Sequence, residues 1–127
     1  SSEEGGGFLM PISLARQVDL VFRELKEELS SLDSGTVFIQ IRNNAIGKFG
    51  IRHNPFEGRE GKVEPTGTGL NEHQWDCFKE MALKSLRYKK YWTHGEIAYD
   101  FAIRKDRLCM SVQFESNYNM SNLIPHL

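Results

Sequence analysis

His73 and Cys77 form the pair of residues whose types and spacing best suit covalent chemistry. They lie four positions apart in a stretch with helical periodicity, so their side chains project from one face, one turn apart. An imidazole beside a thiol can take its proton and leave a nucleophilic thiolate. Because the apolar residues Trp75 and Phe78 flank Cys77, a reduced thiol in the core is the competing interpretation. A small Cys/His-dependent enzyme therefore stays open, and we assign no catalytic residue.

Metal and cofactor sites have no recognisable motif in this chain. The four histidines, His53, His73, His94 and His126, are not paired at the spacing of a metal-binding helix. The glycine-rich stretch 66–69 matches neither a phosphate-binding loop nor a dinucleotide-binding fingerprint. We therefore predict no metal and no cofactor.

Basic residues gather between positions 42 and 62, interleaved with two phenylalanines. This combination is typical of proteins that bind single-stranded nucleic acid, because cations neutralise phosphates and aromatic rings stack on bases. Three glutamates in and beside the same segment reduce its positive charge, and the whole chain has a net charge of −1. A nucleic-acid-binding module is an open alternative. Its contact residues would be Arg42, Lys48, Arg52, Arg59 and Lys62.

A different set of candidate contact residues lies on the polar side of the predicted strands. Alternation places Phe38, Gln40, Asp100 and Gln113 on that side. Phe56 belongs to the segment 54–70, which is long for a connection inside a compact domain. Aromatic side chains on an otherwise polar surface are frequent anchors for protein partners, so these five residues are our candidate protein-binding site.

Two stretches have the periodicity of amphipathic helices, 12–32 and 71–90. The predicted buried stripe of the first is Ile12, Ala15, Val18, Phe22, Leu25 and Leu29. The second begins with Asn71 as N-cap and Gln74 three residues later, the spacing of a capping box. Its predicted buried stripe is Trp75, Phe78, Ala82 and Leu86.

Each helical stretch is followed by a predicted hairpin. Strands at 36–42 and 45–53 flank the two-residue turn Asn43-Asn44, and strands at 96–104 and 107–115 flank Lys105-Asp106. The second hairpin alternates large apolar residues with small or polar ones, as strands do when one face of the sheet is buried. The sequence thus predicts the order α-β-β-α-β-β. The fold class is α+β, a two-layer sandwich whose antiparallel sheet of about four strands has two helices on one face.

The composition fits one globular domain: 127 residues, 39% hydrophobic and 11% aromatic. No apolar run approaches the roughly 20 residues that cross a bilayer, so we expect no membrane association. We expect residues 1–9 to be a disordered lead-in or a vector-derived remnant and 10–127 to form the domain. Two isolated cysteines indicate reduced thiols and a cytoplasmic location.

Residues 75–118 contain, in order, a helix, the step Tyr91-Trp92-Thr93, a strand pair across a charged turn, and Phe114-Glu115 followed by Tyr118. In order and spacing this segment resembles the YezG-type family of small bacterial immunity proteins. In that family a helix runs into a Trp-Thr step and a strand–turn–strand that ends in an aromatic-acidic segment. The resemblance implies a role in binding a protein partner.

The residues and the resemblance together favour a small, non-enzymatic, cytoplasmic domain that binds or regulates a protein partner and is immunity-like in its class. Because the predicted sheet has unpaired strand edges, a homodimer is a further prediction. The nucleic-acid-binding module and the Cys/His-dependent enzyme stay open as alternatives.

Overall fold

The computed structural model describes residues 12–54, 58–59, 62–63 and 69–124. The elements are α1 (Leu14–Leu29), β1 (Ser34–Arg42), β2 (Ala45–His53), β3 (Gly58–Arg59), β4 (Lys62–Val63), α2 (Glu72–Ser85), the 3-10 turn η1 (Leu86–Tyr88), β5 (His94–Arg104), β6 (Arg107–Ser116) and the 3-10 turn η2 (Met120–Asn122). The two long helices and four long strands follow each other as α-β-β-α-β-β. The predicted α+β class is confirmed.

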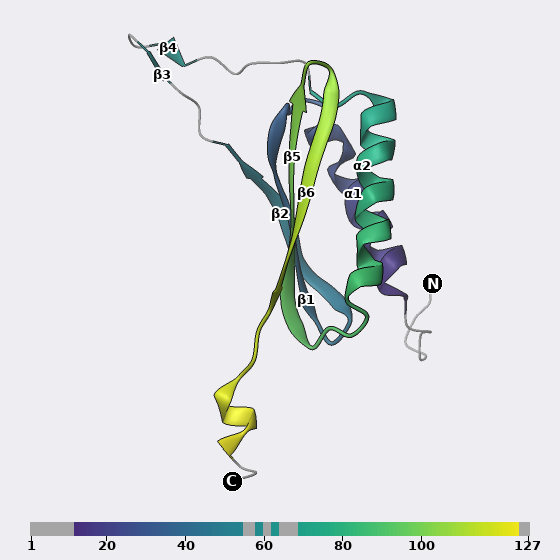
Figure 1. Cartoon of the computed structure of the whole chain (residues 1–127), viewed down its shortest axis with the longest axis vertical. Coiled ribbons are helices and arrows are strands. Elements are labelled where there is room, and N and C mark those ends of the chain that lie inside the picture. Colours follow the sequence, from purple (N-terminus) through teal and green to yellow (C-terminus); the bar gives the residue numbers. More distant parts are fainter. Residues whose placement is uncertain (1–11, 55–57, 60–61, 64–68, 125–127) are drawn as a thin grey trace, which may run out of the picture.

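The main sheet is an open, four-stranded antiparallel sheet with the order β2-β1-β5-β6 (Figure 1). Both hairpin turns are confirmed, and all four of their central residues have positive φ: Asn43, Asn44, Lys105 and Asp106. Two-residue hairpin turns need that conformation to match the twist of the strands. The two hairpins join through their first strands, β1 and β5, which become the centre of the sheet.

Both helices lie on one side of the sheet, where α1 packs on α2 and on β2, and α2 packs on β6 (Figure 1). Ser13 caps α1 and the capping box predicted for α2 is present. Ile12 and Ala15 are exposed, so their predicted place in the buried stripe is wrong. Ile12 precedes the cap and Ala15 lies in the first turn, whereas Val21, further along the helix, is buried instead.

The core between the layers is built around aromatic rings. Phe22 of α1 meets Phe78 of α2 edge to face at 4.9 Å between ring centroids, and Tyr99 and Phe101 of β5 contact Phe78 from the sheet. The Tyr99 hydroxyl donates to the carbonyl oxygen of Ala82 at 3.4 Å. Burial raises the pKa of Tyr99 to about 12, against a smaller opposite effect of the hydrogen bond from Ser85.

Two features lie away from this body (Figure 1). The strands β3 and β4 pair with each other in a separate two-stranded sheet, at one end of the molecule. Beyond β6, the chain continues away from the sheet into η2, and residues 117–121 and 123–124 are exposed. Their apolar side chains are Tyr118, Met120, Leu123 and Ile124, with exposed fractions of 57% or more.

Candidate functional site

The side of the main sheet opposite the helices, called the open face below, is not covered by any described element (Figure 1). It is formed by every second residue of the strands, while the alternate residues enter the core. The register places Phe38 of β1 beside Ala98 of β5, and Ala98 beside Gln113 of β6. Asp100 lies beside Thr36 in the next row. Four of the five predicted protein-binding residues, Phe38, Gln40, Asp100 and Gln113, therefore share the open face; Phe56 lies outside the described residues.

Phe38 is the aromatic centre of the open face and is half-buried. Its ring lies against Gly50 of the neighbouring strand, where an added Cβ would be 3.0 Å from the ring. The guanidinium of Arg52 lies over the ring at 4.4 Å from its centroid, and the Lys48 ammonium lies 6.0 Å away. Cations over an aromatic face are attracted by its quadrupole. The ring is thus held in place and partly covered by exposed basic side chains.

Polar side chains around Phe38 are connected by hydrogen bonds. Thr36 donates to the carboxylate of Asp100. The side-chain amide of Gln40 and the guanidinium of Arg52 each donate to Glu96 Oε1 at 3.3 Å. These pairs link neighbouring strands and leave donors and acceptors of both signs at the surface, which suits a protein partner with mixed polarity.

The basic residues of the nucleic-acid alternative fall on the same face. Arg42, Lys48 and Arg52 are exposed, and Arg42 Nε donates to His94 Nε2 at 3.2 Å. The side chains of Arg59 and Lys62 are not among those described. The two competing predictions therefore share one surface, because β2 borders β1 and brings its cations alongside Phe38 and Gln40.

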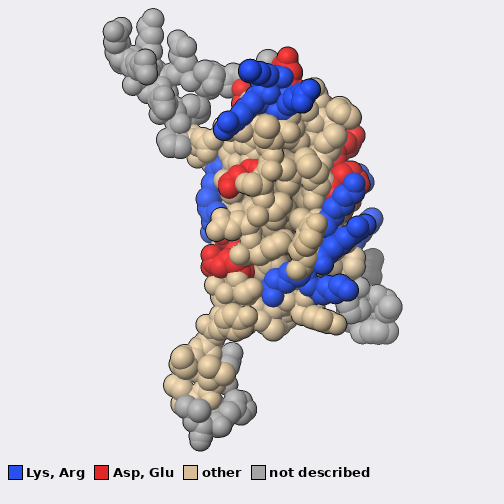
Figure 2. Space-filling view, in the orientation of Figure 1, with Lys and Arg blue, Asp and Glu red and all other residues tan. Residues whose placement is uncertain are grey.

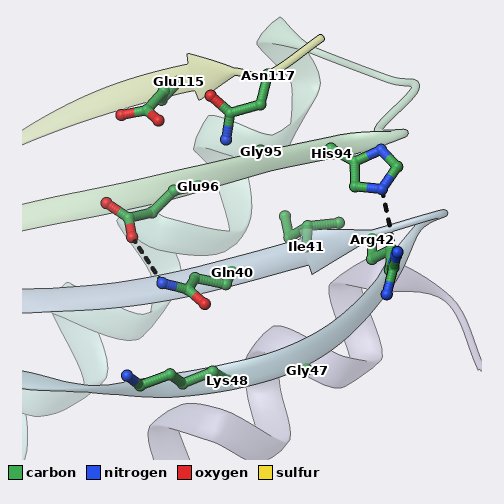
Figure 3. Close-up of a pocket in the computed structure, with 10 residues that line it drawn as sticks. All are labelled: Gln40, Ile41, Arg42, Gly47, Lys48, His94, Gly95, Glu96, Glu115 and Asn117. Carbon is green, nitrogen blue, oxygen red and sulfur yellow. Dashed lines mark hydrogen bonds between the residues drawn. The ribbon is translucent and has the colours of Figure 1, made fainter. Parts of the chain in front are cut away.

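A hollow of about 450 Å³ lies at one end of the open face (Figure 3). Its charged lining residues have both signs: Arg42, Lys48, Glu96 and Glu115. Gly95 lies among them, and a Cβ there would meet Glu115 O at 2.3 Å and the Trp92 ring at 2.4 Å. The close approach of these chains therefore requires glycine at position 95. The mixed charge suits polar groups of a partner rather than a purely anionic ligand.

The candidate catalytic pair lies on α2, in the helix layer. Cys77 Sγ is 3.6 Å from His73 Nε2, so the predicted juxtaposition exists. Cys77 is half-buried and His73 is exposed. Among the described residues no further side chain hydrogen-bonds to the His73 ring, and no group of three or more metal-ligating residues occurs. The pair lacks the third group that orients the base in a nucleophilic site.

A feature that the sequence reasoning missed lies where α2 ends. Tyr88 and Tyr91 are 83% and 81% exposed. Four basic residues surround them, namely Lys84, Arg87, Lys89 and Lys90, and no acidic residue occurs between Glu80 and Glu96. The turn Asn43-Asn44 binds this segment through its backbone N–H groups, which donate to the carbonyls of Thr93 and Trp92. Basic residues near a helix C-terminus suit its dipole, and the interleaved tyrosines are the signal in the sequence that could have indicated a binding site here.

Comparison with protein-family models, curated proteins and solved structures found no match to this chain. The resemblance of residues 75–118 to YezG-type immunity proteins therefore stays a prediction. Neither α1 nor α2, the long helices of the described residues, has the length and apolar character needed to cross a membrane.

Proposed function

We propose that the chain is a non-enzymatic domain that binds a protein partner through the open face of its sheet. The observation that carries the proposal is an aromatic ring, Phe38, held at the centre of a polar face that no described element covers. Large aromatic side chains with flanking arginines are the usual energetic centres of protein interfaces. Around Phe38, the paired charges of Arg52 and Glu96 can exchange partners on binding.

The partner class follows from the mixed polarity of this face. A protein surface with charges of both signs and an apolar side chain for Phe38 would match it better than a polyanion. If the resemblance to immunity proteins holds, the partner is a toxin and the domain is its inhibitor. The two free cysteines, Cys77 and Cys109, agree with a cytoplasmic setting.

The test begins with a photo-crosslinking amino acid at Gln113 on the open face, with the same group at the exposed Glu80 of α2 as control. A protein other than this chain itself that is captured from cells of the source organism only through position 113 is then purified. Its affinity is measured for the natural domain and for a Phe38→Ala/Arg52→Glu variant. We expect a loss of at least about tenfold, because removal of an interface centre costs 2 kcal/mol or more. Equal capture at both positions, or an unchanged affinity, would contradict the proposal.

A nucleic-acid-binding function is the second candidate, and a specific observation favours it. The exposed Tyr88 and Tyr91 lie among four cations without a nearby acidic residue in sequence. Stacking of a base on an aromatic ring contributes about 1–3 kcal/mol. A Tyr88→Ala/Tyr91→Ala variant should therefore lose affinity for a single-stranded oligonucleotide, and binding by the natural domain should weaken steeply with salt. Salt-independent binding, or none, would exclude this candidate.

A further inference from the structure

The outer edge of β6 has unpaired backbone groups in the described structure. The backbone N–H of Ile103 in β5 donates to Asp33 O, on the side away from β6. Ile103 therefore does not hydrogen-bond to Leu108, its neighbour in β6. At the other end, Asn117 N–H donates to His94 O of β5. The odd-numbered residues of β6 therefore bond to β5. The even-numbered residues, Leu108, Met110, Val112 and Phe114, point their N–H and C=O groups outward.

Between its two charged residues, Arg107 and Glu115, this edge lacks the features that prevent strands from pairing with other chains. All ten residues of β6 follow a regular one-to-one register with β5, and none is Gly, Pro or Lys. The opposite edge, β2, has a register shift opposite Ile39–Ile41, two glycines and Lys48. Bulges and lysines protect sheet edges, whereas a long regular edge is a template for another strand.

We infer that β6 pairs antiparallel with β6 of a second copy of this chain, with the two-fold axis at Ser111. This register places Arg107 opposite Glu115 of the second copy. It also places Leu108 opposite Phe114 and Met110 opposite Val112, so the outward backbone groups meet and each pair exchanges two hydrogen bonds. If the axis moved by one residue, Arg107 and Glu115 would no longer lie opposite each other. The attraction between these two charges therefore favours the register centred on Ser111.

The side chains beside this edge also need a cover. Leu108, Met110, Val112 and Phe114 point towards the helix layer but remain half-exposed. Gln74 of α2 donates to Asp106 O, so this flank of α2 faces the β5–β6 hairpin. Met81, 36% exposed, lies two turns further along that flank. Figure 2 shows a largely uncharged strip down the middle of this view, where Figure 1 places β6.

The same pairing gives the exposed tail a neighbour. The segment 117–124 continues from β6 away from its own body (Figure 1). In an antiparallel pair it passes beside the Lys105-Asp106 turn of the second copy. Since the axis is perpendicular to the sheet, both open faces lie on the same side of one continuous sheet. The dimer does not depend on the proposed partner binding.

The charges provide the first test, by sedimentation over a range of concentrations. Arg107→Glu and Glu115→Arg should each raise the dimer dissociation constant at least about tenfold, because symmetry repeats each like-charge pair twice. The double variant R107E/E115R should restore dimerisation. A natural chain that is monomeric throughout, single variants that dimerise normally, or a double variant without recovery would overturn the inference. Phe38→Ala should still dimerise, so failure of the two proposals can be told apart.

Crosslinking provides the second test, in a Cys109→Ser background. A Ser111→Cys variant places two thiols across the axis at a non-hydrogen-bonded pair, where Cα atoms are about 4.5 Å apart and a disulfide can form. Gln113→Cys is the matched control on the same face of β6, because it lies opposite position 109 of the second copy. Mild oxidation should crosslink the Ser111→Cys chain and not the Gln113→Cys chain. Equal crosslinking of both would overturn this register.

Discussion

The two faces of the main sheet are made by the same four strands and differ in almost every physical property. On the helix-covered face, Val37, Ile39, Ile97 and Tyr99 are completely buried. On the open face, the residues next to them in sequence are half-buried or exposed, and they connect through polar contacts across the strands. A core residue and a candidate contact residue are therefore chain neighbours. Variants one residue apart can separate stability from binding.

The largest expected difference in stability is between variants of two phenylalanines, one on each face of the sheet. Phe101→Ala removes a ring that is 3% exposed and packs on Phe78, so it should cost about 3–5 kcal/mol in the free energy of unfolding. Phe38→Ala removes a half-buried ring with two cations over it and should cost about 1 kcal/mol or less. Urea unfolding followed by circular dichroism measures both. Similar losses would mean that the open face contributes to the core.

Two glycines give the next contrast. Gly95→Ala would push a Cβ against backbone and the Trp92 ring on the covered face, with an expected loss of about 1–3 kcal/mol. Gly47→Ala meets nothing within 4 Å and should change stability by about 0.5 kcal/mol or less. Thermal and urea unfolding of the two variants compare them directly. A tolerated alanine at position 95 would show that the Trp92 ring can move aside.

Two hydroxyl groups test hydrogen bonding on the two faces. Tyr99→Phe removes a buried donor and leaves Ala82 O and Ser85 without that partner, so a loss of about 1 kcal/mol is expected. Thr36→Val removes a donor to Asp100 on the solvent side, where water replaces it, and should cost less. Urea unfolding of the two variants compares their losses in the free energy of unfolding. A larger loss at Thr36 would identify the Thr36–Asp100 contact as structural.

Tyr99 also predicts a dependence on alkaline pH. Its pKa is raised to about 12 by burial, from an ordinary value of 10.0. Above pH 10.0 the unfolded state loses the Tyr99 proton while the folded state keeps it. The contribution of Tyr99 to the free energy of unfolding is therefore complete below pH 10.0 and declines as pH rises towards 12. The free energy of unfolding, measured at both ends of that pH window, should decline less for Tyr99→Phe than for the natural chain. Identical declines would place the alkaline sensitivity elsewhere.

The smallest expected change in stability is at the rim of the helix layer, where Asp19 lies. Asp19 accepts from Arg23 at 2.7 Å and lies 3.2 Å from Lys79, and the hydrogen bond from Arg23 lowers its pKa despite partial desolvation. The ionised Asp19 therefore contributes to the free energy of unfolding above its ordinary pKa of 3.8, and this contribution is lost as pH falls through the lowered pKa. Asp19→Asn should cost about 1 kcal/mol or less at neutral pH. The difference from the natural chain should vanish in acid; a constant difference would point to packing instead.

Local patterns predicted the elements well because their causes are local. The capping box at Asn71 and Gln74 and the two-residue turns at Asn43-Asn44 and Lys105-Asp106 depend on residues within one turn of each other. Ile12 shows the limit, because its periodicity fits the stripe but it precedes the Ser13 cap and lies exposed. Alternation also predicted that Phe38, Gln40, Asp100 and Gln113 share a face. It could not indicate that Arg52 lies over Phe38, since that contact depends on the packing of β2 beside β1.

By itself, the sequence determined the order of the elements, the residues that face the core on each strand, and the turns. These follow from side-chain periodicity and backbone preferences, which act over a few residues. The strand β2 is the exception, because its register shifts opposite Ile39–Ile41 and Phe49 is exposed. Only the tertiary structure decided that β1 pairs with β5 and that β6 is left as a regular free edge. It also decided that the basic and aromatic candidates occupy one surface. Strand order depends on how two helices and two hairpins bury their apolar faces together, and that is a property of the whole chain.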